Sequence, residues 1–162
     1  MTAVEWLTSW KTKTNLCGID KEAKTQYNKT RKETAMKIVW YMEASNEKIR
    51  PHFKAKEFQC KDKTEGLLVA ADLLDILEKI RNHFNTPVII NSGYRTPNWN
   101  SKVNGSSNSY HCKGMAADIV VKGHSSKEVA EYADKIMEQG GIIRYTNFTH
   151  IDVREKKYRK GV

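Results

Sequence analysis

Two short apolar segments of this sequence carry ionisable residues in their interior. Residues 116–121 and 148–153 both read as strands; the first contains Asp118 and the second contains His150 and Asp152. Because side chains alternate between the two faces of a strand, Phe148, His150, Asp152 and Arg154 share one face. A polar row on an otherwise apolar strand is unusual in a simple amphipathic strand, although a solvated surface row would also fit this spacing.

A further imidazole, His111, precedes the first of these strands. Two imidazoles and one carboxylate from neighbouring strands would give a zinc ion three protein ligands and leave a fourth position for water. Zinc in such an open site lowers the pKa of its water to about 7, so hydroxide is available to attack a peptide carbonyl. We therefore expect His111, Asp118 and His150 to be metal ligands.

The other patterns predict a small α+β domain, with helices on one face of a mostly antiparallel sheet. Helices are expected from Asp20 to about Ser45, from near Thr64 to Phe84, and from Ser125, whose capping box with Glu128 opens a helix to about Gln139. Further strands are expected over 87–92 and 142–145, with a hairpin turn after the latter, and residues 98–109 read as a loop. Residues 1–49 are expected to form a helical extension of undisclosed role, and residues 50–162 the main domain.

The chain is basic, with 28 Lys+Arg against 19 Asp+Glu and a formal net charge of +9. Such an excess of positive charge bears on binding partners rather than on the fold, because it attracts any polyanion, including a bacterial wall. No nucleic-acid-binding motif accompanies the charge. The densest basic cluster is C-terminal and consists of Arg154, Lys156, Lys157, Arg159 and Lys160.

No segment has the run of about 18 apolar residues that a membrane span needs, and the first twenty residues lack the apolar core of a secretory signal. We therefore expect a protein made in the cytoplasm, with no membrane partner. The odd number and wide spacing of Cys17, Cys60 and Cys112 argue against a disulfide framework and favour three reduced thiols.

Three separated motifs, in the same order, resemble the zinc D-Ala-D-Ala carboxypeptidase family. The segment 109–118 matches the family's S-x-H-x-x-G-x-A-x-D signature at every position, residues 92–96 (SGYRT) resemble its S-G-Y-R-[ST] element, and residues 149–154 (THIDVR) resemble its closing strand. The likeness covers about residues 50–154. The family includes peptidoglycan carboxypeptidases, resistance dipeptidases and the L-alanyl-D-glutamate endopeptidases of phage endolysins, and it shares its fold with hedgehog signalling proteins.

The resemblance implies roles for particular residues. His111, Asp118 and His150 would bind zinc, Ser109 would help to hold substrate, and Arg95 would face the polarised carbonyl or a substrate carboxylate. A guanidinium is always charged and presents several donors, which suits a developing oxyanion.

One feature departs from the family pattern. Many members carry Glu or Asp three residues before the final histidine as general base, and some carry histidine two before it, whereas this chain has Asn147 and Phe148 there. Neither side chain accepts a proton from water at neutral pH. Asp152 is the nearest carboxylate on the expected face, either as the base or, more in keeping with its place, as the group that orients His150.

The sequence thus predicts a zinc peptidase that hydrolyses an amide bond of the peptidoglycan stem peptide, either D-Ala-D-Ala or L-Ala-D-Glu. Without a signal peptide and with a basic surface, it fits a phage or prophage endolysin that acts on the anionic wall after release from the cytoplasm. The alternative is a catalytically inactive, zinc-stabilised module that binds the cell wall or another polyanion.

Overall fold

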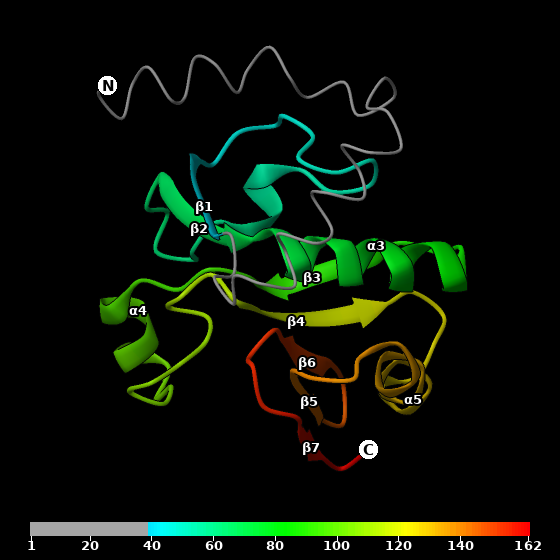
Figure 1. Ribbon diagram of the computed structural model, residues 1–162. Coiled ribbons are helices and arrows are strands. Elements are labelled where there is room, and N and C mark those ends of the chain that lie inside the picture. The colour runs from blue at the N-terminus through cyan, green and yellow to red at the C-terminus, as the bar shows by residue number, and fades with distance from the viewer. Residues whose placement is uncertain (1–38) are drawn as a thin grey trace, which may run out of the picture. The chain divides into compact units, whose positions relative to one another are not determined.

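A computed structural model describes residues 39–162 of the protein, and its centre is a five-stranded sheet (Figure 1). The strand order is β3-β4-β6-β5-β7, and neighbouring strands are antiparallel except β5 and β7. The strands are β3 (Val88–Ser92), β4 (Ala116–Val121), β5 (Gly141–Arg144), β6 (Thr149–Asp152) and β7 (Tyr158–Lys160). This architecture confirms the predicted α+β class.

Two helices cover one face of this sheet (Figure 1). Helix α3 (Ala71–Phe84) packs against β3 and β4, and α5 (Ser126–Ile136) packs against β4, β5 and β6 and also contacts α3. The helices bury Leu74, Leu77 and Ala133 against the strand residues Ile119 and Ile151, all of which are at most 1 % exposed. The helices therefore do not cover the opposite face of β4 and β6, which carries the alternate side chains of these two strands.

Several elements lie where the sequence predicts them. Strand β3 begins one residue later than the predicted span 87–92, β4 matches 116–121, and β5 and β6 form the predicted hairpin within one residue at each start. The Ser125 hydroxyl accepts a hydrogen bond from the Glu128 amide, and the Glu128 carboxylate accepts one from the Ser125 amide, so the capping box is confirmed. The helix that it opens ends at Ile136 rather than near Gln139.

Two predicted helices were wrong at one end, for a shared reason. Strand β1 (Val39–Glu43) lies within the span 20–45 that was predicted to be helical, and β2 (Gly66–Ala70) lies within the predicted start of α3. The two segments pair as antiparallel strands, with Trp40 opposite Val69. In β2 the buried residues Leu67 and Val69 alternate with the half-buried Leu68, which is strand periodicity. A distant partner thus overrode a local pattern that fits a helix equally well.

Strand β1 belongs to the same compact unit, residues 37–162, as the sheet, although the sequence analysis assigns residues 39–49 to the extension. The predicted helical segments before residue 39, and the role of residues 1–38, lie outside the described residues.

Two short elements were missed. Residues 97–102, predicted in part as loop, form helix α4 (Pro97–Lys102), whose N-cap Thr96 accepts a hydrogen bond from the Trp99 amide at 3.1 Å. A threonine cap followed by proline at the first helical position is a readable start signal. Strand β7 was missed because it is three residues long and lies in the basic C-terminal cluster. A 3-10 helix, η1 (Ala55–Phe58), precedes β2.

Gly114 joins the loop after α4 to β4 in a conformation that other residues resist. Its φ is +67°, and a Cβ there would lie 2.5 Å from the backbone carbon of Leu68. Its carbonyl accepts a hydrogen bond from the Ala70 amide, so the backbone approaches β2 closely. The glycine of the 109–118 motif is therefore required by packing as well as by conformation.

We expect Gly114→Ala to destabilise the protein by about 2–5 kcal/mol, because a left-handed φ costs about 1–2 kcal/mol and the overlap with β2 adds about 1–3 kcal/mol. Gly123→Ala is the matched control, since Gly123 has φ +81° but nothing within 4 Å of the added Cβ. Urea denaturation of both variants measures the difference. Equal destabilisation would show that the close approach to Leu68 is unimportant.

Candidate metal centre

Asp118 and His150 lie directly opposite each other on β4 and β6. Their neighbours Ile119 and Ile151 point into the core beneath the helices, so alternation directs Asp118 and His150 to the other face of the sheet. Asp118 Oδ1 lies 2.9 Å from His150 Nδ1, and both residues are at least nine-tenths buried, with 7 % and 9 % exposed. The sheet register therefore creates the pair.

His111 reaches the pair from the loop before β4. Its Nδ1 lies 2.7 Å from the carbonyl oxygen of Gly93, which fixes Nδ1 as the donor and leaves Nε2 free. That Nε2 lies 3.2 Å from His150 Nδ1 and 3.3 Å from Asp118 Oδ1. The loop is held by hydrogen bonds from the Gly114 and Arg95 amides to the His111 carbonyl.

The three atoms have the spacing of metal ligands. They lie 2.9–3.3 Å apart, whereas atoms about 2.0–2.1 Å from zinc at tetrahedral angles lie about 3.3 Å apart. Two imidazole nitrogens and one carboxylate oxygen are also a donor set of catalytic zinc sites. His111, Asp118 and His150 are thus positioned to bind a metal ion.

The surroundings of Asp118 favour its ionised form, which is the form that binds a metal. Burial acts to raise the pKa of Asp118, but hydrogen bonds with His111 and His150 outweigh it and hold the pKa well below its usual range. The carboxylate is therefore ionised at neutral pH, as a metal ligand must be.

Asp152 lies behind His150, on the side away from the three ligand atoms. Its Oδ2 is 3.1 Å from His150 Nε2, which places the ring proton on Nε2 and leaves Nδ1 to the metal. Arg154 donates to both carboxylate oxygens, at 2.7 and 2.5 Å, and the Gly141 amide donates to Oδ1 at 3.1 Å. Burial opposes ionisation of Asp152, but the hydrogen bonds of Arg154 and His150 lower its pKa below the usual range. The side chain of Asp152 is fully buried, so these contacts favour an orienting role over that of a base.

Arg154 lies on the face of His150 and Asp152, where strand alternation places it, whereas no role at the site was predicted for Gly141. The Arg154 guanidinium lies between the rings of Tyr110 and Tyr158, with its Cζ 4.4 and 4.6 Å from the ring centroids. Gly141 leaves room for the carboxylate, because a Cβ there would lie 2.2 Å from Asp152 Oδ2. The contact of Gly141 with Asp152 and that of Arg154 with Tyr158 depend on the pairing of β5 with β6 and β7.

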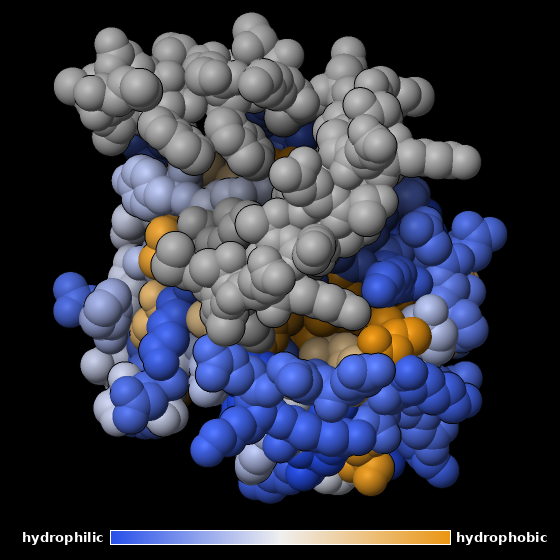
Figure 2. Space-filling model, in the orientation of Figure 1, coloured by the Kyte–Doolittle hydropathy of each residue, from blue (hydrophilic) through white to orange (hydrophobic). Residues whose placement is uncertain are grey.

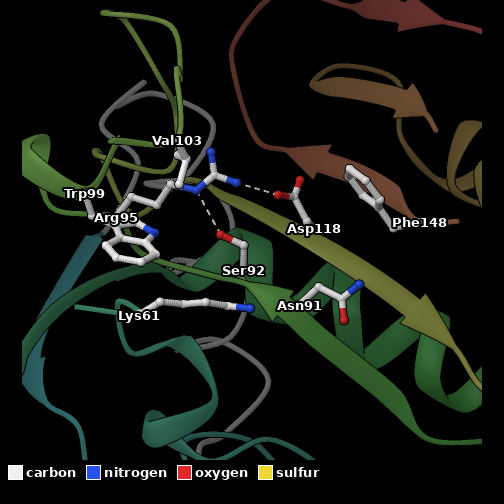
Figure 3. Close-up of a pocket in the computed structure, with 8 residues that line it drawn as sticks. All are labelled: Lys61, Asn91, Ser92, Arg95, Trp99, Val103, Asp118 and Phe148. Atoms are coloured by element: carbon white, nitrogen blue, oxygen red, sulfur yellow. Dashed lines mark hydrogen bonds and ion pairs between the residues drawn. The ribbon is translucent and has the colours of Figure 1, made fainter. Parts of the chain in front are cut away.

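Arg95 lies on the other side of Asp118. Its Nη2 donates to Asp118 Oδ2 at 2.6 Å, and its Nε donates to the hydroxyl of Ser92 at 2.9 Å (Figure 3). Together with Asp118 and Phe148 it lines a hollow beside the three ligand atoms. The structure thus brings Arg95 to the candidate site.

Ser109 and Asn147 are placed less directly. Ser109 is half-buried in the loop two residues before His111, and its backbone carbonyl accepts a hydrogen bond from the Cys112 amide. Its substrate-binding role stays a prediction. Asn147 is exposed in the turn before β6, so the positions where relatives carry a base hold an amide and, at Phe148, a ring.

The comparison with known families agrees with this geometry. The family model for peptidase M15 matches residues 51–152. The chain belongs to the peptidase M15 family. No curated protein matches the chain at a significant level. The matched span contains the three candidate ligands, Arg95 and Asp152, and membership in M15 implies a metallopeptidase.

Other expectations concern charges and thiols of this M15 domain. Cys60 and Cys112 are free, as predicted, and Cys17 lies outside the described residues. Hydrophilic residues dominate the surface over α5 and the C-terminal strands (Figure 2). In the C-terminal basic cluster, however, Arg154 pairs with Asp152, while Arg159 and Lys157 both pair with Asp134. Over residues 39–162, no helix is both long and apolar enough to cross a bilayer.

We expect the zinc-loaded, desalted protein to retain one zinc ion per chain, and His111→Ala to lose it because only two ligands remain. His124→Ala is the matched control. His124 follows the end of β4, and its imidazole contacts Glu128 and the Phe84 ring rather than any of the three candidate ligands. Elemental analysis and the zinc-dependent rise in melting temperature measure both variants. Full zinc retention by His111→Ala would contradict the assignment.

Proposed function

We propose that this protein is a zinc-dependent peptidoglycan peptidase that hydrolyses an amide bond of the stem peptide, as a phage or prophage endolysin. The observation that carries the proposal is the convergence of two imidazole nitrogens and one carboxylate oxygen at 2.9–3.3 Å beside an open hollow. M15 membership supports hydrolysis of a peptide bond, and the net charge of +9 supports attraction to an anionic wall.

In this proposal, His111, Asp118 and His150 hold zinc, which when bound polarises a carbonyl and makes hydroxide available near neutral pH. Arg95 contributes guanidinium donors on the hollow side of Asp118, where they would stabilise negative charge on the carbonyl oxygen. Ser109, in the loop before His111, would help to hold the peptide.

Asp152 would act as a positioning residue. Its contact with His150 Nε2 fixes the tautomer and orientation of that ring, and Arg154 and Gly141 occupy its remaining lone pairs. With an amide at Asn147 and a ring at Phe148, the proton released from water would pass to solvent in the hollow rather than to a dedicated carboxylate.

The second candidate function is a noncatalytic, zinc-stabilised module that binds the wall. It is favoured by Asn147 and Phe148, because neither side chain can act as a general base. Both functions require the metal, so only turnover separates them.

We expect the purified, zinc-loaded protein to release new amine and carboxyl termini from cell-wall sacculi, detected by mass spectrometry. His150→Ala should abolish the release because the zinc site is lost, and His124→Ala should retain it. The masses of fragments from defined muropeptides would identify the bond. Sacculi that bind the zinc-loaded protein and stay intact would establish the noncatalytic module instead.

For Asp152 we expect Asp152→Asn to weaken zinc affinity about 10–100-fold, the usual effect of losing an orienting carboxylate, and to regain most turnover at saturating zinc. Asp134→Asn is the matched control, because Asp134 pairs with Arg159 and Lys157 away from the ligands. Zinc titration and turnover are measured on the same samples. Loss of turnover at full zinc occupancy would identify Asp152 as the general base.

A further inference from the structure

The hollow beside the candidate metal centre is small and has walls from four separate parts of the chain (Figure 3). Its volume is about 220 Å³, below the range of about 300–1,000 Å³ that holds a whole small-molecule ligand. It therefore suits one part of a larger substrate. The lining residues are Lys61, Asn91, Ser92, Arg95, Trp99, Val103, Asp118 and Phe148.

The hollow is continuous with the metal centre through Asp118. Asp118 Oδ1 faces the two imidazoles, while Oδ2 accepts the hydrogen bond of Arg95 in the hollow wall. A substrate group bound in the hollow would therefore lie next to the carbonyl that the metal would polarise.

Two cations line the hollow, and they differ in how they are paired. The Arg95 guanidinium is neutralised by Asp118 at 2.6 Å. Lys61 is exposed and has no ion-pair partner among the described residues. The carboxylate next to it in sequence, Asp62, is engaged by the Thr96 hydroxyl and the Thr64 amide. The charge of Lys61 is therefore available to a ligand.

The surroundings of Lys61 suit a carboxylate attached to a short carbon skeleton. In Figure 3 the Lys61 side chain extends along the hollow toward Ser92 and Asn91, and these three residues also line a second, adjoining hollow. Trp99 and Phe148 provide apolar walls on either side of this polar floor. One unpaired ammonium beside a site for a divalent cation disfavours a cationic or neutral polar group and favours an anion.

We propose that Lys61 is a specificity-determining residue that binds a free carboxylate of the substrate next to the scissile amide. The proposal rests on the proposed function and narrows it to stem peptides whose carboxylate is free rather than converted to a carboxamide. Arg95 then stabilises negative charge on the scissile carbonyl oxygen, and Lys61 binds the substrate carboxylate.

The test uses two matched pairs of synthetic stem peptides. One pair carries D-Glu or its α-carboxamide, D-isoglutamine, and the other ends in a free acid or a terminal amide. For at least one pair, the zinc-loaded wild type should show kcat/KM about tenfold higher for the acid, the scale of one charge-assisted hydrogen bond.

In Lys61→Met, kcat/KM for the preferred acid should fall to the value for its amide, and Lys61→Arg should restore most of the preference. Lys79→Met is the matched control, since Lys79 is an exposed lysine of α3 that lines neither hollow. A preference for the acid that persists in Lys61→Met, or that falls equally in Lys79→Met, would overturn the proposal.

Binding separates this proposal from the peptidase function. Calorimetry with metal-depleted protein in chelator measures the affinity for the same peptides without hydrolysis, and Lys61→Met should bind the acid about tenfold more weakly. If the wild type binds acid and amide equally, the Lys61 proposal fails even where turnover is seen. If binding discriminates between them and no peptide is cleaved, the peptidase function fails and the carboxylate site stands.

Discussion

The contact between Asp118 and His150 across β4 and β6 is the constraint around which this fold is organised. An ionised carboxylate in a central strand is costly to bury unless it is paired and hydrogen-bonded. Here it meets two imidazoles and a guanidinium, which together use both of its oxygens. Removing any of these partners would leave a buried charge incompletely paired, so the site and the stability of the sheet depend on the same contacts.

Each of the two central strands serves both purposes through alternation. Residues such as Ile119 and Ile151 anchor the strands beneath α3 and α5. Asp118 and His150, which alternate with them, lie on the opposite face and are positioned to bind a metal ion. A tightly packed core therefore fixes the backbone that carries the candidate ligands. The third candidate ligand, His111, lies in a loop, and its ring is fixed by the Gly93 carbonyl.

Support for the site extends outward to the C-terminal end of the chain. His150 contacts Asp152, Asp152 contacts Arg154, and the Arg154 guanidinium lies between two tyrosine rings, one next to His111 and one on β7. A planar guanidinium can bind a carboxylate along its edge and aromatic rings on its faces, which lysine cannot do. The short parallel strand β7 thus supports the candidate metal centre although it holds none of the three candidate ligands.

The amino-acid sequence by itself determined which chemistry is available and roughly where. The motif at 109–118 and the polar row at His150 and Asp152 predicted the ligand trio, and strand periodicity predicted β3, β4 and the β5–β6 hairpin, because those signals are local. Tertiary structure alone decided that β1 and β2 pair as strands, that the Gly141 amide donates to Asp152, and that Lys61 faces the hollow. These features depend on partners far away in the chain. Apolar runs such as 66–70 satisfy helix and strand patterns alike, and an exposed lysine looks the same in sequence wherever it points, so only the packed fold distinguishes the alternatives.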